Sequence, residues 1–228
     1  AIKKDPDDIE AYSNWAVMLA ENGQIEQAVE RYNKALAIKP DNADIHNNLG
    51  NALKNQGKLA QAAEHYQKAL SLKPDFAQAQ VSFADTLRMQ GRFDAAIEHY
   101  KLALKADSNS SDACYGLGMV MSQTNHPDQA VDWYRKAIAL DPRNIFAQGQ
   151  LGLALAGQGK IDDAINQFQI VLKARPNDDQ MHCNLGILLE GQGKTDEAIE
   201  QYRRALQIKP DNKKAAELLD AALAKQKK

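Results

Sequence analysis

The sequence lacks the features that mark a membrane protein or a nucleic-acid binder. It has 228 residues and no run of about 18 apolar residues, so no segment is expected to span a membrane. Its 28 Lys and Arg nearly balance its 30 Asp and Glu, which gives a formal charge of −2. That balance excludes the strong positive field that attracts nucleic acid or anionic lipid.

Cysteine is almost absent as well. Cys114 and Cys183 are the only two, and their spacing fits no metal site. We interpret them as reduced, partly buried thiols, which favours a reducing compartment. Together with the missing apolar segment, this predicts a soluble, cytoplasmic protein.

Catalytic motifs are also missing. No glycine-rich phosphate loop follows a predicted strand. His182 and Cys183 are adjacent, so on a helix their side chains point in different directions and cannot form a catalytic pair. His65 and His99 hold equivalent positions and could be neighbours, but no third ligand for a transition metal is evident. We therefore predict no enzyme activity, no cofactor and no metal site.

What the sequence does contain is a unit of thirty-four residues that returns along nearly the whole chain. The unit at 43–76 reads ADIHNNLGNALKNQGKLAQAAEHYQKALSLKPDF. One alanine recurs in every unit, at Ala28, Ala62, Ala96, Ala130, Ala164 and Ala198. An aromatic residue recurs four places later, at Tyr32, Tyr66, Tyr100, Tyr134, Phe168 and Tyr202. A proline recurs at Pro6, Pro40, Pro74, Pro142, Pro176 and Pro210, and only Ser108 interrupts it.

Each unit predicts two helices joined by a tight turn. Leu49 and Ala52 are spaced like one face of a helix, and 62–70 repeats that spacing. Gly57 lies between the two, where a residue that tolerates positive φ can end the first helix. Pro74 cannot continue the second helix.

Polar and small residues complete the unit. Asp75, and Asp41 or Asn42 one unit earlier, can cap the next helix through a side-chain oxygen. Gly50 can let two helices approach closely, and Tyr66 is expected to fill the space between neighbouring pairs.

The fourth unit departs most from the pattern. Ser108 replaces the proline before it, and Asn125 replaces the glycine, although Asn also tolerates the left-handed conformation. Pro127 then falls near the first turn of the second helix, where its missing N–H costs little. We expect this unit to be folded.

The pattern H-x2-L-G-x2-L, then A-x3-Y, then P, resembles the tetratricopeptide repeat. The resemblance covers nearly the whole chain. It implies an all-α, right-handed α-solenoid, a superhelix of six antiparallel helix pairs with a C-terminal capping helix. The expected segments are a tail of a preceding repeat at 1–8, six repeats at 9–42, 43–76, 77–110, 111–144, 145–178 and 179–212, and the capping helix at 213–228.

Both ends of the chain are informative in this frame. Residues 1–6 match residues 35–40 in register, so we expect the chain to be a piece of a longer protein with more repeats upstream. From Lys213 the repeat stops, and one amphipathic helix follows. Such a helix can cover the apolar face of the last repeat.

The resemblance also implies a binding surface, because first helices line the concave side of such arrays. The residues expected to face that groove are Asn47, Asn48, Asn51, Lys54, Asn55, Val81, Asp85, Arg88, Tyr115, Met119, Phe146, Leu153 and Ile187. Amides could bind an extended peptide backbone, and the later apolar residues could hold apolar anchors. Alternatively, several of the apolar residues pack against the next repeat.

Two narrower resemblances are incomplete. The clamp that holds the terminal carboxylate of chaperones is incomplete here, because Ser82, Asp112 and Gly116 stand where basic or amide residues are needed. The asparagine ladder of O-linked N-acetylglucosamine transferase repeats is matched at three of six places, in the series Asn14, Asn48, Ser82, Gly116, Gln150 and Asn184.

The leading prediction is a non-catalytic protein–protein interaction scaffold that binds a peptide or amphipathic helix of a partner protein in its concave groove. One alternative is the substrate-recruiting arm of a larger enzyme, such as a glycosyltransferase. The other is a self-assembling scaffold. No nucleic-acid partner is expected.

Overall fold

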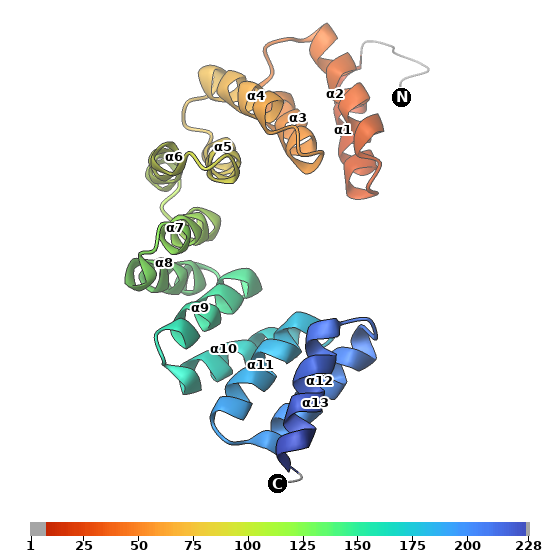
Figure 1. Cartoon of the computed structure of the whole chain (residues 1–228). Coiled ribbons are helices and arrows are strands. Elements are labelled where there is room, and N and C mark those ends of the chain that lie inside the picture. The colour runs from red at the N-terminus through yellow and green to blue at the C-terminus, as the bar shows by residue number, and fades with distance from the viewer. Residues whose placement is uncertain (1–7, 227–228) are drawn as a thin grey trace. The chain divides into compact units, whose positions relative to one another are not determined.

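The computed structural model describes residues 8–226, and within that range it is entirely helical (Figure 1). Seven helices hold the place of the first helix of a repeat: α1 (Ile9–Glu21), α3 (Ala43–Asn55), α5 (Ala77–Met89), α7 (Ser111–Gln123), α9 (Ile145–Gly157), α11 (Asp179–Gly191) and α13 (Lys213–Gln226). We call them the first helices. Six second helices alternate with them: α2 (Ile25–Ile38), α4 (Leu59–Leu72), α6 (Phe93–Ala106), α8 (Pro127–Leu140), α10 (Ile161–Ala174) and α12 (Thr195–Ile208). The prediction of an all-α repeat solenoid is confirmed. The expected tail at 1–8, apart from Asp8, lies outside the described residues, as do Lys227 and Lys228.

The chain divides into two compact units, unit 1 (Ala1–Val120) and unit 2 (Met121–Lys228), and the division falls within α7. In unit 1, α1, α3 and α5 each pack against the second helix that follows. Each of α2 and α4 also packs against the next first helix, and neighbouring first helices touch. In unit 2, α9 to α13 repeat the same scheme. Each unit therefore has a layer of first helices and a layer of second helices.

Most first helices begin at a polar side chain that caps them. The oxygen of this residue accepts a hydrogen bond of 2.8–3.2 Å from the N–H three residues later, at Asp8, Asn42, Ser110, Asn144, Asp178 and Asn212. The expectation for Asp75 is wrong, because α5 begins after Phe76, which has no capping side chain. Asp75 lies one place too early. Asp41 is not the cap of α3 either, and its carboxylate pairs with Lys68 at 2.7 Å.

The turns between paired helices carry the only positive φ angles of the described residues. Gly57 has a φ of 74°, and the equivalent glycines are nearly identical. Asn125 takes the same place in the fourth repeat with a φ of 62°. Pro127 then occupies the first turn of α8. These predictions from the sequence are confirmed.

A glycine of the first helix lies against an aromatic ring of the second helix in several pairs. A Cβ on Gly50 would come within 2.7 Å of Tyr66 Cε1, and one on Gly152 within 2.6 Å of Phe168 Cε1. Tyr66 was expected to fill the space between neighbouring pairs. It lies within its own pair and also faces Phe83 of the next, with 6.3 Å between ring centroids. The recurring alanines beside these rings are fully buried.

Glutamine side chains join successive repeats at one end of the helices. A glutamine at the end of a first helix donates to an aspartate in the first turn of the preceding second helix, thirty residues earlier. The pairs in unit 2 are Gln158–Asp128 (2.8 Å), Gln192–Asp162 (2.6 Å) and Gln226–Asp196 (2.6 Å). The last pair belongs to α13, so this helix is held in the same way as α9 and α11.

Helix α13 covers the apolar side of the final pair. Leu218, Leu219 and Leu223 pack against a buried cluster that includes Leu189 and Tyr202. The opposite side of α13 is exposed and mostly charged or small. It therefore closes the layered core at this end of unit 2, as a capping helix should.

Two glycines of α9 provide a test of the helix contact. Gly152→Ala should lower the free energy of unfolding by about 1–3 kcal/mol, because the new methyl group overlaps the Phe168 ring. Gly157→Ala is the control, since no atom beyond its chain neighbours and the nearby backbone of α9 lies within 4 Å of its Cβ position, and it should be neutral or stabilising by up to about 1 kcal/mol. Urea unfolding of the full chain measures both. Equal effects would show that the ring does not limit the approach of the helices.

Candidate functional site

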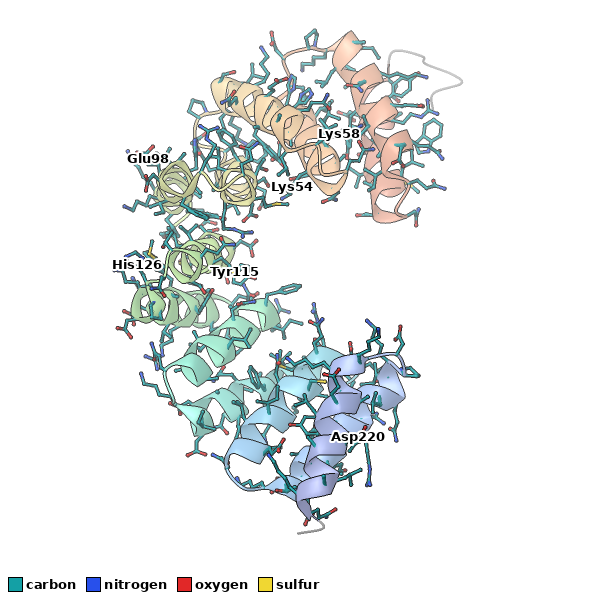
Figure 2. The ribbon with its side chains drawn as sticks, viewed as in Figure 1. Lys54, Lys58, Glu98, Tyr115, His126 and Asp220 are labelled. Atoms are coloured by element: carbon teal, nitrogen blue, oxygen red, sulfur yellow. The ribbon has the colours of Figure 1, made fainter. Side chains whose placement is uncertain are left out.

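The outer side of the first helices in unit 1 carries most of the polar residues expected to bind a partner. We call this surface the first-helix face, formed by α3, α5 and the part of α7 up to Val120. Lys54 of α3 and Tyr115 of α7 lie on this side, whereas Glu98 of α6 lies on the opposite side (Figure 2). The structure therefore brings predicted residues of α3 and α7 onto one side of unit 1.

Buried tyrosines hold two of these side chains in place. The Tyr66 hydroxyl donates to Asn51 Oδ1 at 2.8 Å, and the Tyr100 hydroxyl donates to Asp85 Oδ1 at 2.5 Å. Burial is the main cause that raises the pKa of both phenols, so both remain protonated donors at neutral pH. These hydrogen bonds hold the side chains of Asn51 and Asp85 in place. Each side chain can still accept a hydrogen bond from a ligand.

Two predicted residues are too buried to offer an open contact. Asn47 is 4% exposed and Val81 is 5% exposed, so both pack within the helical layers. Asn47 Nδ2 donates to Asn48 Oδ1 at 3.3 Å. The Asn47 Oδ1 atom is buried and has no partner among the described residues. Asn48 therefore presents an amide that is positioned by the residue beneath it.

The remaining residues of the first-helix face differ in charge and depth. Lys54 and Arg88 are half-buried cations, and Asn55 is exposed. Tyr115 and Met119 of α7 are half-buried. The face therefore offers amides, both signs of charge and an apolar area within one unit.

The other predicted apolar residues belong to unit 2. Phe146 and Leu153 of α9 and Ile187 of α11 are exposed, with Phe146 at 57%. The Arg175 guanidinium lies over the Phe146 ring, 4.5 Å from its centroid. These residues are accessible on the outside of their helices and do not pack as core.

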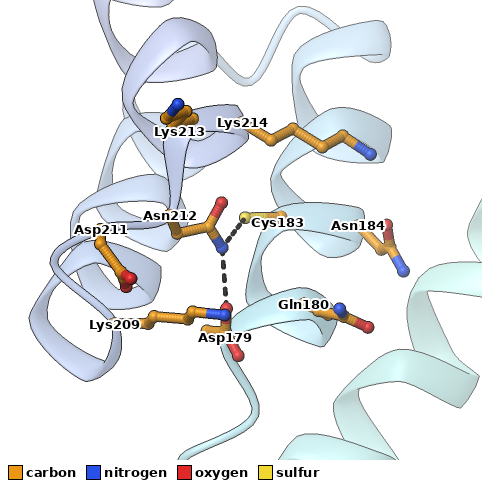
Figure 3. Close-up of a pocket in the computed structure, with 9 residues that line it drawn as sticks. All are labelled: Asp179, Gln180, Cys183, Asn184, Lys209, Asp211, Asn212, Lys213 and Lys214. Carbon is orange, nitrogen blue, oxygen red and sulfur yellow. Dashed lines mark hydrogen bonds between the residues drawn. The ribbon is translucent and has the colours of Figure 1, made fainter.

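A pocket of about 490 Å³ lies between α11 and the start of α13 in unit 2 (Figure 3). Asn212 crosses it, donating to Asp179 Oδ2 at 2.8 Å and to Cys183 Sγ at 3.8 Å. The other lining residues are mostly cationic or amide-bearing: Gln180, Asn184, Lys209, Asp211, Lys213 and Lys214. None of the three lysines forms an ion pair with another described residue.

This pocket was missed at the level of sequence. The signal was present, because Gln180, Cys183 and Asn184 hold the same places in their repeat as Phe146, Asn47 and Asn48, which were expected to face the groove. The contribution of Lys213 and Lys214 was not foreseen. They belong to α13, which was interpreted only as a cap.

The chemistry of the pocket does not include an activated thiol. Burial, followed by the charge of Asp179, raises the pKa of Cys183, so the thiol stays protonated. His182 points elsewhere and contacts Gln201 at 2.7 Å. The expectation that His182 and Cys183 diverge is confirmed.

The histidines pair within their own repeats. His65 Nδ1 lies 3.0 Å from His46 Nδ1, and His99 Nδ1 lies 2.6 Å from Gln80 Oε1. Within residues 8–226, no three His, Cys, Asp or Glu side chains are grouped in a way that could hold a metal ion. None of the described helices combines the length and apolar character that crossing a membrane requires.

The link between core and surface can be measured by a double-mutant cycle. Tyr66→Phe and Asn51→Ala each remove one partner of the 2.8 Å hydrogen bond, and the double variant removes both. We expect a coupling free energy of about 0.5–1.5 kcal/mol in urea unfolding, the usual net value of one hydrogen bond. Additive effects would mean that the phenol does not hold Asn51.

Four family models of the tetratricopeptide repeat match the chain. One described as "TPR repeat" matches residues 16–57, and three described as "Tetratricopeptide repeat" match residues 43–76, 75–143 and 150–213. No curated protein matches the chain in sequence.

Solved structures show the same fold. The Cut9–Hcn1 hetero-tetramer of the APC/C matches with a TM-score of 0.87 and 17% identity, over 97% of this chain and 44% of that one. The chain thus spans less than half of that relative. PilF of Pseudomonas aeruginosa matches with a TM-score of 0.82 and 21% identity, over 93% and 97% of the two chains.

A third structure is closer in sequence. YrrB, described as a TPR protein with an unusual peptide-binding site, has 26% identity and a TM-score of 0.62, over 83% of this chain and 97% of its own. The family models together span most of the chain, and the helices, glycine turns and paired layers agree with them. The chain therefore belongs to the tetratricopeptide repeat family.

Proposed function

We propose that the chain is a non-catalytic scaffold that binds an extended or helical segment of a partner protein along its first helices. The observation that carries this proposal is the row of polar side chains on the first-helix face that buried tyrosines hold in place. Asn51 and Asp85 are ordered before any ligand arrives, so less conformational entropy is lost on binding. Amide groups beside them can both donate to and accept from a peptide backbone.

The repeat pattern supports the same conclusion. Residues that pack, such as Ala62 and Tyr66, recur from unit to unit, whereas the outer residues of the first helices differ in each. Varied side chains on a constant frame suit recognition of one particular series of contacts. The likeness to YrrB adds support, because that protein is described as having a peptide-binding site.

The pocket in unit 2 suggests what part of a partner would bind there. Lys209, Lys213 and Lys214 outnumber Asp179 and Asp211, and the three ammonium groups lack ion partners among the described residues. An acidic segment would be attracted to this pocket, and its carboxylates could pair with the lysines. The exposed Phe146 and Ile187 of the same unit could hold apolar residues of the partner.

Two other roles stay open as alternatives. A scaffold of this kind can recruit substrates for a larger enzyme, or it can assemble with copies of itself. Neither is favoured by a particular side-chain arrangement, whereas the ordered polar row favours peptide recognition directly.

The first-helix face can be tested with peptides selected from a displayed random library against the full chain. Asn48→Ala combined with Asn55→Ala should raise the Kd of a selected peptide about tenfold or more, as loss of central contacts does. The control is Gln61→Ala with Gln67→Ala, two exposed amides of α4. Calorimetric titration gives each Kd. Equal Kd values for the two double variants would place the site elsewhere.

The pocket has a separate electrostatic test. Lys213→Glu with Lys214→Glu should weaken the binding of selected acidic peptides about tenfold or more and reduce the dependence of Kd on NaCl concentration. Lys173→Glu, at an exposed site of α10, should leave the Kd nearly unchanged. Selected peptides without acidic residues, or an unchanged Kd in the double variant, would contradict an acidic partner.

A further inference from the structure

The fourth side chain of a first helix forms a bridge in at least three repeats. It bonds to the backbone carbonyl of the proline in the preceding connection and to a side chain of its own second helix. His46 Nε2 lies 2.8 Å from Pro40 O, Gln80 Nε2 lies 3.2 Å from Pro74 O, and His182 Nε2 lies 3.1 Å from Pro176 O. The bridges continue to His65, His99 and Gln201. Each bridge ties a connection to both helices of the pair that follows it.

Two of these bridges can adapt to a change in protonation. Gln80 donates through Nε2 to Pro74 O and accepts through Oε1 from His99 Nδ1, so a second proton on the other nitrogen of His99 leaves that bond intact. In the sixth repeat, the amide of Gln201 can present either its oxygen or its nitrogen to His182 Nδ1. A glutamine in the pair therefore tolerates either state of the histidine.

The second repeat has no glutamine at either place, because both are occupied by histidines, His46 and His65. A carbonyl oxygen can only accept, so His46 Nε2 carries a proton and donates to Pro40 O. Neutral His46 then has a lone pair on Nδ1, which accepts from His65 Nδ1–H at 3.0 Å. One added proton keeps a single hydrogen between the two Nδ1 atoms. A second added proton places an N–H on both Nδ1 atoms. Neither nitrogen can then accept a hydrogen bond from the other, and the two positive rings repel.

We propose that the His46–His65 pair is a proton-operated latch that opens when both rings become cationic. Opening separates the imidazoles and frees His46 from the second helix, while the Gln-containing bridges of the third and sixth repeats stay closed. The rings are stacked at 5.2 Å between centroids, and His46 is only 8% exposed, so two cations cannot be accommodated without movement.

The surrounding charges do not neutralise the second proton. Burial lowers the pKa of His65 most, the charge of His46 lowers it further, and Glu64 of α4 acts in the opposite direction. Asp41 in the connection also faces His46, but its carboxylate is paired with Lys68, whose hydrogen bond and charge hold the pKa of Asp41 below its usual value. The site therefore resists a double charge.

The sign of the effect follows from linkage. The pKa of His65 is lower in the folded chain than in the unfolded chain, so the unfolded chain binds the proton more readily. The stability that His65 contributes is then fully present above about pH 6.5 and falls as the pH drops below that value. The loss is complete below the lowered pKa of His65.

The latch involves α3, a helix that forms part of the first-helix face. His46 precedes Asn47 and Asn48 on α3, so release of His46 would loosen the start of the helix that presents them. If the proposed function holds, acidification would weaken partner binding at this repeat. The latch itself does not depend on a partner, and its test uses none.

The experiment uses the full chain and needs two measurements. NMR titration of the histidine ring nitrogens from about pH 7.5 to 4.5 should show His46 and His65 titrating in two coupled steps. Urea unfolding over the same range should show the wild-type folding constant falling about tenfold or more relative to His65→Gln, because the doubly protonated wild type loses the hydrogen bond between the rings and gains charge repulsion. His65→Gln creates the pair found at His182 and Gln201, and His46→Gln creates the one found at Gln80 and His99, so both variants should fold at neutral pH.

An exposed histidine supplies the control. His126→Gln should keep the wild-type dependence of stability on pH. The proposal is overturned if His65→Gln and the wild type lose stability in parallel, or if the two rings titrate independently near pH 6.5. The NMR result stands on the wild type alone, so a poorly folding variant would not leave the question open.

Discussion

The contact between an aromatic ring and a glycine sets the distance between the two helices of a pair. Tyr66 lies against Gly50 and Phe168 against Gly152, at places where a Cβ would overlap the ring. The recurring alanines beside these rings are fully buried. Because neighbouring pairs use the same contact, the first helices form one layer and the second helices another within each unit. The side chains that face outward are free to vary.

The same rings connect the core to the candidate binding surface. The phenol hydroxyls of Tyr66 and Tyr100, which belong to second helices, donate hydrogen bonds to Asn51 and Asp85 of the first helices and hold them in place. A residue that was assigned to packing therefore also shapes recognition. Where Phe168 replaces tyrosine, the packing is kept but no hydroxyl is available to order a residue on α9.

The fold could be predicted from the sequence because its determinants are local and recur. Gly57 and Asn125 took the positive φ that their places in the turn require. The site was predictable only in part. The place of a residue in the repeat indicates on which side of its helix it lies, but not how deeply its side chain is buried. Asn47 and Val81 were expected to face the groove, yet both are buried. Contacts such as His46 with His65 depend on which two polar residues meet across a pair, and the period does not specify that.

The glutamine–aspartate bonds between repeats limit how the chain can change in length. Each joins residues thirty positions apart, as Gln192 does with Asp162 and Gln226 with Asp196. One inserted or deleted residue in a turn or helix between the partners would shift the side chains away from each other. Duplication or loss of a complete repeat keeps the spacing of thirty residues in every such bond. Arrays of this kind should therefore evolve in whole repeats, and acquire new specificity by substitution on the outer side of the first helices.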